Sequence, residues 1–365
     1  SRNDGTRYHS TGTLDYVGDW AEVHHLPVSD DLMLISERRN GAAGFSIFDA
    51  SGLYDEDAGT KPRTISRFSF SGVTSPSNYD GYSFALGWQG RRYVYAPTGA
   101  QGLYVIDTTD LNNPVQLRHM SRAQLGNVTL RGAWPIGNML ILAEGNVQSS
   151  FQARIYDISN PGNPVQIGSF NGPFGYHGFV YGSAFYGGGS PVARHDFTNP
   201  ANVVRTDLYP NPDFLNPEYG YGKDGELFIG HYPGATKWKL EGDTAIPAGR
   251  VNSGLVDDHA FLNPLGNLVM LCSDHNNDRK LMIGIHGTER DTTPPVATFT
   301  SPADGATHQN ILSRVGISFT DFVDPITVNA SPVVVRKFST GGPVAGTYSS
   351  MMGIVDFAPD APLEE

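Results

Sequence analysis

Short runs of alternating apolar and polar residues fill most of this chain, and glycine or Asn-Pro pairs separate them. Residues 131–136 form one such run, the pair Gly137-Asn138 follows, and residues 139–143 form the next. After polar loops, residues 153–157 and 165–170 add two more. A period of two with turn residues between the runs predicts strands joined in hairpins and argues against helices. The unit therefore has four short antiparallel strands, which is the content of one β-propeller blade.

One phrase within this unit returns along the chain. It reads Gly-Leu-Tyr-Val-Ile-Asp at residues 102–107 and leads to the pair Asn113-Pro114. Related copies occupy residues 44–49, 153–157 and 192–196, and the last two also lead to Asn-Pro pairs. A repeat with a period of about 40 to 50 residues predicts an array of similar units, each burying its faces against its neighbours.

The innermost strands of these units are predicted to begin near six positions: His25, Phe84, Arg131, His177, Tyr219 and His259. The sixth unit lacks an outer strand before the composition changes at Asp291, whereas residues 10–18 resemble the outer strands at 65–72 and 166–170. Pairing the two ends of the array closes the ring and removes exposed sheet edges. We therefore expect an all-β fold with a six-bladed propeller at residues 1–290, in preference to an open sandwich of the same strands.

The phrase Gly-Leu-Tyr-Val-Ile-Asp followed by Asn-Asn-Pro-Val resembles the LVIVD repeat of bacterial and archaeal surface or secreted proteins. The resemblance extends over residues 10–288, is strong in the second and third units, and is weak in the fifth. It implies a propeller and a location outside the cytoplasm. It implies little about chemistry, because a fold does not fix a function.

A second domain is predicted to follow the proline hinge at residues 291–295, because paired prolines continue neither a helix nor a central strand. Beyond it, short runs such as 296–300, 315–320 and 355–359 alternate with turns and predict a small β-sandwich. These residues are similar to the bacterial Ig-like domain of surface-layer and adhesin proteins, which implies such a domain at 291–365. The family continues with further strands where this sequence stops. We therefore expect an incomplete sandwich, which indicates a fragment of a longer protein; the alternative is completion by a strand from a neighbouring chain.

The charge balance narrows the class of partner. Lys and Arg number 25 against 37 Asp and Glu, which gives a formal net charge of −12. An acidic surface repels phosphate backbones and anionic lipids, so nucleic acid and membrane surfaces are not expected partners. No apolar run is long enough to span a bilayer. The single cysteine, Cys272, excludes an intramolecular disulfide, and the low lysine content with abundant Asn, Ser, Thr and Gly favours an extracellular location.

Candidate binding residues follow from the geometry of a propeller. The first strand of each blade begins, and the second strand ends, at the same face, so side chains at these positions converge around the mouth of the central channel. The first strands contribute His25, Arg131, His177, Tyr219 and His259, and the second strands contribute Glu37, Glu144, His231 and Asp274. A concave site with convergent polar groups predicts ligand binding. The alternative is that these groups line a solvated channel and hydrogen-bond to one another.

Imidazole and carboxylate groups are also the ligands of zinc and the usual groups of acid–base catalysis. The candidate metal ligands are His177, His231 and His259. The candidate base is Glu144 or Glu37. This set would serve a metal-dependent extracellular hydrolase or lyase. The loop 274–278 offers oxygen ligands for calcium, but it lacks the glycine and terminal glutamate of an EF-hand, which favours a plain turn.

We predict a secreted or surface-displayed binding protein rather than an enzyme. Its propeller presents the channel mouth to a protein or glycan partner, and the Ig-like domain serves as a spacer from the cell envelope. The enzyme alternative requires a divalent metal, zinc or calcium. The third possibility is a structural subunit of a surface filament, completed by a strand donated from another copy of this chain. An extended interface at the strand edge after Phe357 would favour it. Further Ig-like domains or copies of the chain itself are the partners expected in that case.

Overall fold

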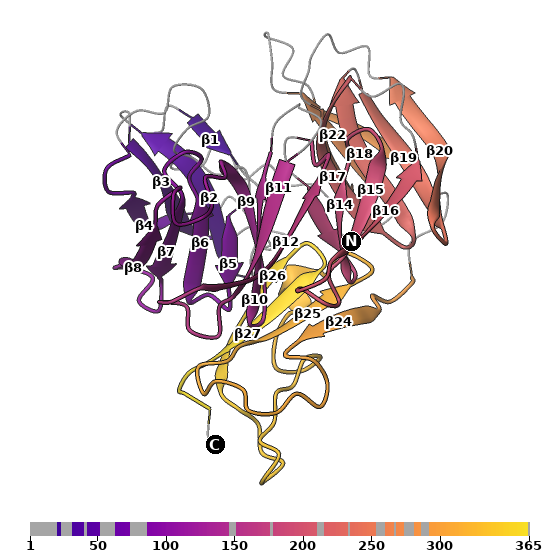
Figure 1. The fold of residues 1–365 in the computed structure, drawn as a ribbon. Coiled ribbons are helices and arrows are strands. Elements are labelled where there is room, and N and C mark those ends of the chain that lie inside the picture. The colour runs from indigo at the N-terminus through magenta and orange to yellow at the C-terminus, as the bar shows by residue number, and fades with distance from the viewer. Residues whose placement is uncertain are drawn as a thin grey trace.

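The computed structural model describes residues 20–22, 31–39, 42–51, 63–73, 86–145, 151–175, 178–209, 215–232, 234–252, 260–265, 268–273, 281–285 and 292–363. Over these residues the fold is all-β, with seven sheets and one 3-10 turn, η2 (Pro325–Thr327). Six sheets are the blades of a propeller, and the seventh forms the C-terminal domain (Figure 1). The predicted fold class is confirmed.

Each blade is a meander in which consecutive strands pair antiparallel from the innermost strand outward. Blade one consists of β1 (Trp20–Glu22), β2 (Leu32–Arg39), β3 (Ala42–Asp49) and β4 (Arg63–Ser69). Blade two consists of β5 (Gly87–Gln89), β6 (Tyr93–Pro97), β7 (Leu103–Asp107) and β8 (Val115–Met120). Blade three consists of β9 (Leu130–Ile136), β10 (Met139–Glu144), β11 (Phe151–Asp157) and β12 (Val165–Gly172). Blade four consists of β13 (Phe179–Tyr181), β14 (Ala184–Gly187), β15 (Val192–Asp196) and β16 (Val204–Tyr209). Blade five consists of β17 (Leu215–Lys223), β18 (Glu226–Tyr232), β19 (Gly234–Glu241) and β20 (Thr244–Asn252). Blade six contains β21 (Ala260–Leu265), β22 (Leu268–Ser273) and β23 (Leu281–Ile285).

Blade five is a complete four-stranded blade, although the repeat signature is absent from it. Blade six has three strands among the described residues. Residues 10–18, which are predicted to complete blade six, lie outside the described part of the chain. The closure of the ring by that segment stays a prediction.

The hydrophobic core lies between neighbouring blades. In β10 the alternation of side chains places Ile141 in a cluster shared with blade four and Leu142 in a cluster shared with blade two. Both residues are fully buried, because each face of the blade is covered by the next blade. This two-sided burial explains why the second strands are apolar at consecutive positions.

The aspartate of the repeated phrase has a structural role. At the end of the third strand of a blade, its Oδ1 accepts a hydrogen bond from the backbone N–H two residues later. The pairs are Asp107 with Thr109 (2.8 Å), Asp157 with Ser159 (2.7 Å) and Asp196 with Thr198 (2.9 Å). These Asx turns start the connection to the outer strand. The signature that reveals the repeat therefore encodes a turn and not a site.

The C-terminal domain contains one four-stranded sheet in the order β24-β25-β27-β26. Its strands are β24 (Ala297–Ser301), β25 (Val315–Phe319), β26 (Gly346–Met351) and β27 (Ile354–Pro359). β27 holds the last strand residues of the chain, Phe357 among them, and lies inside the sheet, so the edges are β24 and β26. An interface with a neighbouring chain at the strand edge after Phe357, which would favour the filament alternative, stays a prediction.

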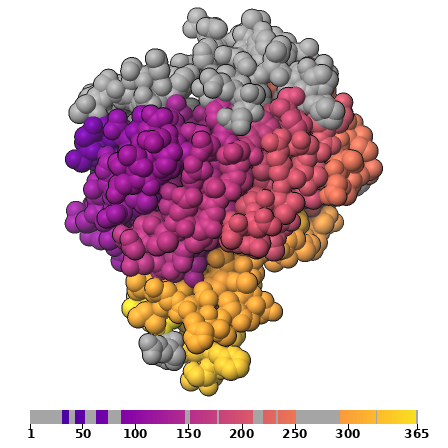
Figure 2. All heavy atoms as spheres, viewed as in Figure 1, coloured from indigo at the N-terminus to yellow at the C-terminus, as the bar shows by residue number. Residues whose placement is uncertain are grey.

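This sheet packs against one end of the propeller. Its strands contact the innermost strands of blades two, three and four, which are β5, β9 and β13. The contacts with β5 come from β26 and β27, those with β9 from β25 and β27, and those with β13 from β25. Figures 1 and 2 show the C-terminal domain at the lower end of the molecule, directly below the blades. We call this the turn end of the propeller, because it carries the turns that join the first strand of a blade to the second, and we call the opposite end the mouth end. The C-terminal domain is docked on the propeller and does not hang from a free hinge at residues 292–295.

Candidate functional site

The nine predicted site residues differ in how far the structure describes them. Arg131, Glu144 and His231 have described side chains, while Glu37 and Tyr219 are placed only as backbone positions in β2 and β17. The residues outside the described part are His25, His177, His259 and Asp274. Tyr219 lies within β17 rather than at its start at Leu215, and β1 precedes His25, so the predicted strand starts are shifted in blades one and five.

Arg131 and Glu144 both lie at the mouth end of blade three. Arg131 is the second residue of β9, and Glu144 is the last residue of β10. Glu144 is paired with Leu130, the neighbour of Arg131, at a bulge that follows Ala143. Arg131 is only 7% exposed. A buried guanidinium and a carboxylate therefore share one corner of the blade.

The Glu144 carboxylate fixes the backbone of its own blade. Its Oε1 accepts a hydrogen bond from Thr129 N (2.8 Å), just before β9, and its Oε2 accepts one from Gln152 N (2.9 Å) in β11. One side chain thus joins the first and third strands at the point where the ladder is interrupted. Both carboxylate oxygens thus accept hydrogen bonds from the backbone of blade three, so Glu144 holds the strand ends of this blade in position.

His231 lies near the end of β18 in blade five and is 1% exposed. Its Nε2 is 2.9 Å from the hydroxyl oxygen of Thr236 in the adjacent strand β19. Among the described residues, no three His, Cys, Asp or Glu side chains lie close enough to hold a metal ion. The zinc set that includes His177 and His259 lies partly outside those residues, so it stays a prediction.

Among the described residues, the most extensive buried polar network lies at the turn end, where sequence analysis predicts no site. Asp356 on β27 is 2% exposed, and its Oδ1 accepts hydrogen bonds from Gly137 N (2.6 Å) and Gln89 Nε2 (3.2 Å). Gln89 also donates to Gly137 O (2.6 Å) and accepts from Arg314 Nε (2.6 Å). Burial raises the pKa of Asp356 to about 7, against the lowering effects of these hydrogen bonds and of the Arg314 charge.

Arg314 joins the two domains more directly than any other side chain described. It is 1% exposed, donates through Nη1 to Leu312 O (2.8 Å) and through Nη2 to Ile158 O, and lies over the ring of Tyr93 at 5.2 Å. Its backbone N–H donates to Asn138 Oδ1 (3.0 Å). An arginine with this number of partners orients the Ig-like sheet relative to blades two and three.

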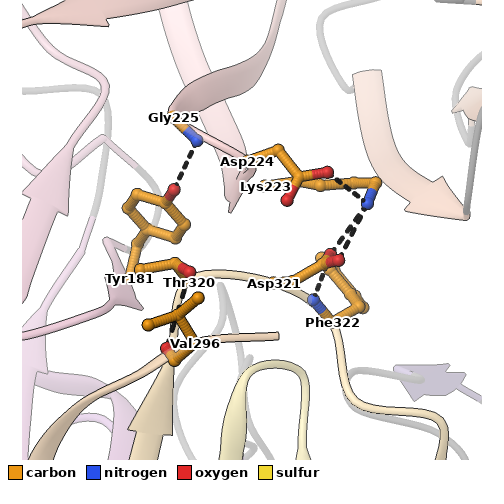
Figure 3. A network of polar contacts seen from close by, with 8 residues as sticks. All are labelled: Tyr181, Lys223, Asp224, Gly225, Val296, Thr320, Asp321 and Phe322. Atoms are coloured by element: carbon orange, nitrogen blue, oxygen red, sulfur yellow. Dashed lines mark hydrogen bonds and ion pairs between the residues drawn. The ribbon is translucent and has the colours of Figure 1, made fainter. Parts of the chain in front are cut away.

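A second contact connects the C-terminal domain to blade five (Figure 3). The Lys223 ammonium lies 2.9 Å and 3.0 Å from the two carboxylate oxygens of Asp321, and 2.9 Å from Asp224. Asp224 N donates to Thr320 O (3.0 Å) beside this pair. Burial raises the pKa of Asp321, although Lys223 acts in the opposite direction. Both members of the ion pair are buried, so they stabilise the interface only as a pair.

The contacts between the two domains at the turn end require glycine in the turns of the propeller. Gly137 has φ = 57°, and a Cβ there would lie 1.9 Å from Ser301 O. A Cβ on Gly316 of β25 would lie 2.0 Å from Gly137 N. The backbones of the two domains therefore meet without an intervening side chain. The Gly137-Asn138 pair was visible in the sequence as a turn, but no local pattern shows what packs on it.

Comparison with known proteins identifies the fold and the C-terminal domain. No curated protein sequence matches this chain. Among solved structures, a protein from Lactobacillus plantarum is similar with a TM-score of 0.52 at 10% identity, covering 96% of this chain and 89% of that one. The Cps50 (Swd1) β-propeller domain of Myceliophteria thermophila has a TM-score of 0.49 at 9% identity, with 94% and 97% covered.

A hypothetical selenium-binding protein from Sulfolobus tokodaii has a TM-score of 0.47 at 11% identity, with 93% of each chain covered. At such identities, likeness shows the fold and not the activity. Over the described residues, no helix is long and apolar enough to cross a membrane. The family model described as a bacterial Ig-like domain matches residues 291–365, so the chain joins a β-propeller to a bacterial Ig-like domain.

Proposed function

We propose that this protein is an extracellular binding protein whose propeller presents its mouth end to a protein or glycan partner. The observation that carries the proposal is the position of the Ig-like domain. It occupies the turn end through contacts with the turns of blades two to five, at Gly90, Gly137, Gly182 and Asp224. Because the Ig-like domain covers the turn end, we infer that a partner binds at the opposite end of the propeller, the mouth end.

The described side chains at the mouth end support binding over catalysis. Glu144 and His231 are engaged in hydrogen bonds within their own blades, and they belong to different blades. Both oxygens of Glu144 accept hydrogen bonds from backbone amides, which supports a structural role for this carboxylate over that of a general base. These side chains fix the ends of the strands from which the surrounding loops leave.

The resemblances of the two domains support an extracellular location. The bacterial Ig-like domain at 291–365 is compatible with an extracellular protein. We assign the propeller to the LVIVD class on the repeated phrase at residues 102–107 and 153–157. The net charge of −12 disfavours nucleic acid as the partner. The docked Ig-like domain acts as a fixed base, which sets the direction in which the mouth end points.

Site-specific attachment of a polymer tests which end of the propeller binds. A cysteine replaces Ala123, which is exposed in the mouth-end loop before β9, or Asn112, which is exposed in the turn-end loop before β8. Each variant carries a Cys272→Ser replacement and is labelled with a polyethylene glycol maleimide. Binding to intact cells of the native host is then measured by flow cytometry.

We expect saturable binding that the polymer at position 123 abolishes and the polymer at position 112 leaves within twofold of the unlabelled protein. Loss of binding with the polymer at position 112 alone would show that the mouth end is not the binding face. Equal effects of the two polymers, or no saturable binding, would refute the proposal as a whole.

A further inference from the structure

A groove of about 510 Å³ lies where the Ig-like domain meets the outer strands of blades three and four. Both domains line it. The propeller contributes Asn138, Met139, Asp157, Ser159, Ile167 and neighbours in blade four, and the Ig-like domain contributes β24 and the loop that follows it, as far as Asn310. This volume is within the usual range of small-molecule sites. It is at the turn end, so it is distinct from the mouth-end surface of the proposed function.

The walls of the groove are held in place by packing. Phe299 on β24 contacts Phe197 of blade four edge to face, with ring centres 5.1 Å apart. A Cβ on Gly168 of β12 would lie 1.8 Å from Pro200 O, so blades three and four approach at backbone distance beside the groove. Asn138 donates from its backbone to Ser301 Oγ (3.1 Å), which ties blade three to β24. The groove is therefore formed before any ligand arrives.

Several polar groups along the groove have no partner among the described residues. Asp157 uses one carboxylate oxygen for its Asx turn and leaves the other available. The hydroxyls of Ser159 and Thr198 and the imidazole of His308 make no hydrogen bond within the described part of the chain. His308 also has φ = 56°, a backbone conformation that is uncommon for residues other than glycine. Donors and acceptors thus line a preformed space.

We propose that this groove binds a short neutral saccharide. Hydroxyl groups of a sugar both donate and accept hydrogen bonds, and the hydroxyls of Ser159 and Thr198 in the lining can do the same. Met139, Ile167 and Pro200 supply apolar surface for the C–H faces of a sugar ring. Among the described residues that line the groove there is no Lys or Arg, so phosphate, sulfate and uronate groups would meet the Asp157 carboxylate without a lysine or arginine to compensate their charge.

The test uses the full chain and compares two threonines with the same local structure. Thr198 and Thr109 both follow an Asx turn and are both exposed, but only Thr198 lines the groove. Thr198→Val and Ser159→Ala each remove one groove hydroxyl, and Thr109→Val is the matched control. Binding of cellotriose, maltotriose and N,N′-diacetylchitobiose is measured by saturation-transfer NMR and calorimetry, with tetra-alanine as the peptide probe.

We expect at least one saccharide to bind saturably, and Thr198→Val and Ser159→Ala to weaken it about three- to tenfold each, the size of one lost hydrogen bond. Thr109→Val should bind as the wild type does. Absence of saturable saccharide binding, or equal binding by the groove variants and the wild type, would overturn the proposal. Binding of tetra-alanine in place of the saccharides, lowered by Thr198→Val, would assign the groove to peptides instead. None of these outcomes alters the polymer experiment on the mouth end, so the two proposals fail separately.

Discussion

Asp356 makes the stability of this protein fall as the pH rises through neutrality. The carboxyl group is buried between the two domains, and burial raises its pKa from 3.8 to about 7. The folded state therefore holds a proton more tightly than the unfolded state does. The favourable contribution is fully present below pH 3.8 and is lost as the pH rises through 7. At about 1.4 kcal/mol per pKa unit, the loss amounts to about 4 kcal/mol.

Asp356→Asn removes the ionisation and keeps an acceptor oxygen for Gly137 N–H and Gln89 Nε2. At pH 4.5, slightly above the unfolded pKa of 3.8, we expect the free energies of unfolding of the variant and the wild type to differ by about 1 kcal/mol. At pH 8 the variant should be more stable, by up to about 4 kcal/mol, because only the wild type must bury a charge. Replacing a charged residue at an interface would here increase stability.

Urea unfolding followed by tryptophan fluorescence, at matched ionic strength and at intervals from pH 4.5 to 8, measures both free energies. Asp207→Asn is the control, because Asp207 is a surface carboxylate with 56% of its side chain exposed. Its difference from the wild type should stay within about 0.5 kcal/mol across the range. A constant difference between Asp356→Asn and the wild type, or a less stable variant at pH 8, would refute the reasoning.

Three other replacements test the remaining contacts. Lys223→Met leaves the buried Asp321 carboxylate without its cation and should lower the free energy of unfolding by about 3 to 5 kcal/mol in the same urea assay. Glu144→Ala removes the acceptor of one part-buried and one exposed backbone amide, so a loss of about 1 to 2 kcal/mol is expected by thermal unfolding, and Glu144→Gln should recover part of it. Gly137→Ala forces a side chain against Ser301 O and should increase hydrogen exchange at the turn end while leaving the core strands of blade three protected; unchanged exchange would contradict the contact.

The blades could be predicted from the sequence because the information that specifies them is local. In β10 the period of two is short-range, and the Asp157 turn closes over two residues. Blade five shows the limit of that signal. Its third and fourth strands are joined by the two-residue turn Gly242-Asp243, which has no place for the Asp and Asn-Pro signature. A tighter hairpin stands where blades two to four have the Asx turn, so the blade is present without the sequence signature of the repeat.

The mouth-end positions were partly predictable for the same reason. Arg131 and Glu144 are at the expected strand ends because the turn between β9 and β10 sets their register. The role of Glu144 was not predictable. A glutamate that accepts hydrogen bonds from two backbone amides and a glutamate that faces a ligand would both stand at this position of the sequence. The choice depends on Gln152, which comes from β11 after a loop whose length carries no information about its path.

The junction between the domains was hidden for a different reason. Asp356 and Gln89 are 267 residues apart, and neither belongs to a motif. The alternation in β25 places Gly316 and Ser318 on one face and apolar residues on the other, which is the pattern of a sheet with one solvated face. In the structure the face with Gly316 and Ser318 is buried on the propeller.

Small side chains explain both the misleading pattern and the geometry of the interface. Gly316 and Ser349 on the Ig-like sheet are matched by Gly90 and Gly137 on the propeller, so backbone groups and short hydroxyls meet directly, as in the hydrogen bond from Gly90 N to Ser349 Oγ (2.7 Å). Long surface side chains would hold the domains apart and permit a hinge. With small residues on both sides, buried polar groups such as Asp356 find partners only when the domains are docked. The Ig-like domain is therefore held in one orientation on the propeller, and a change at this interface should be felt in the turns of the blades that it contacts.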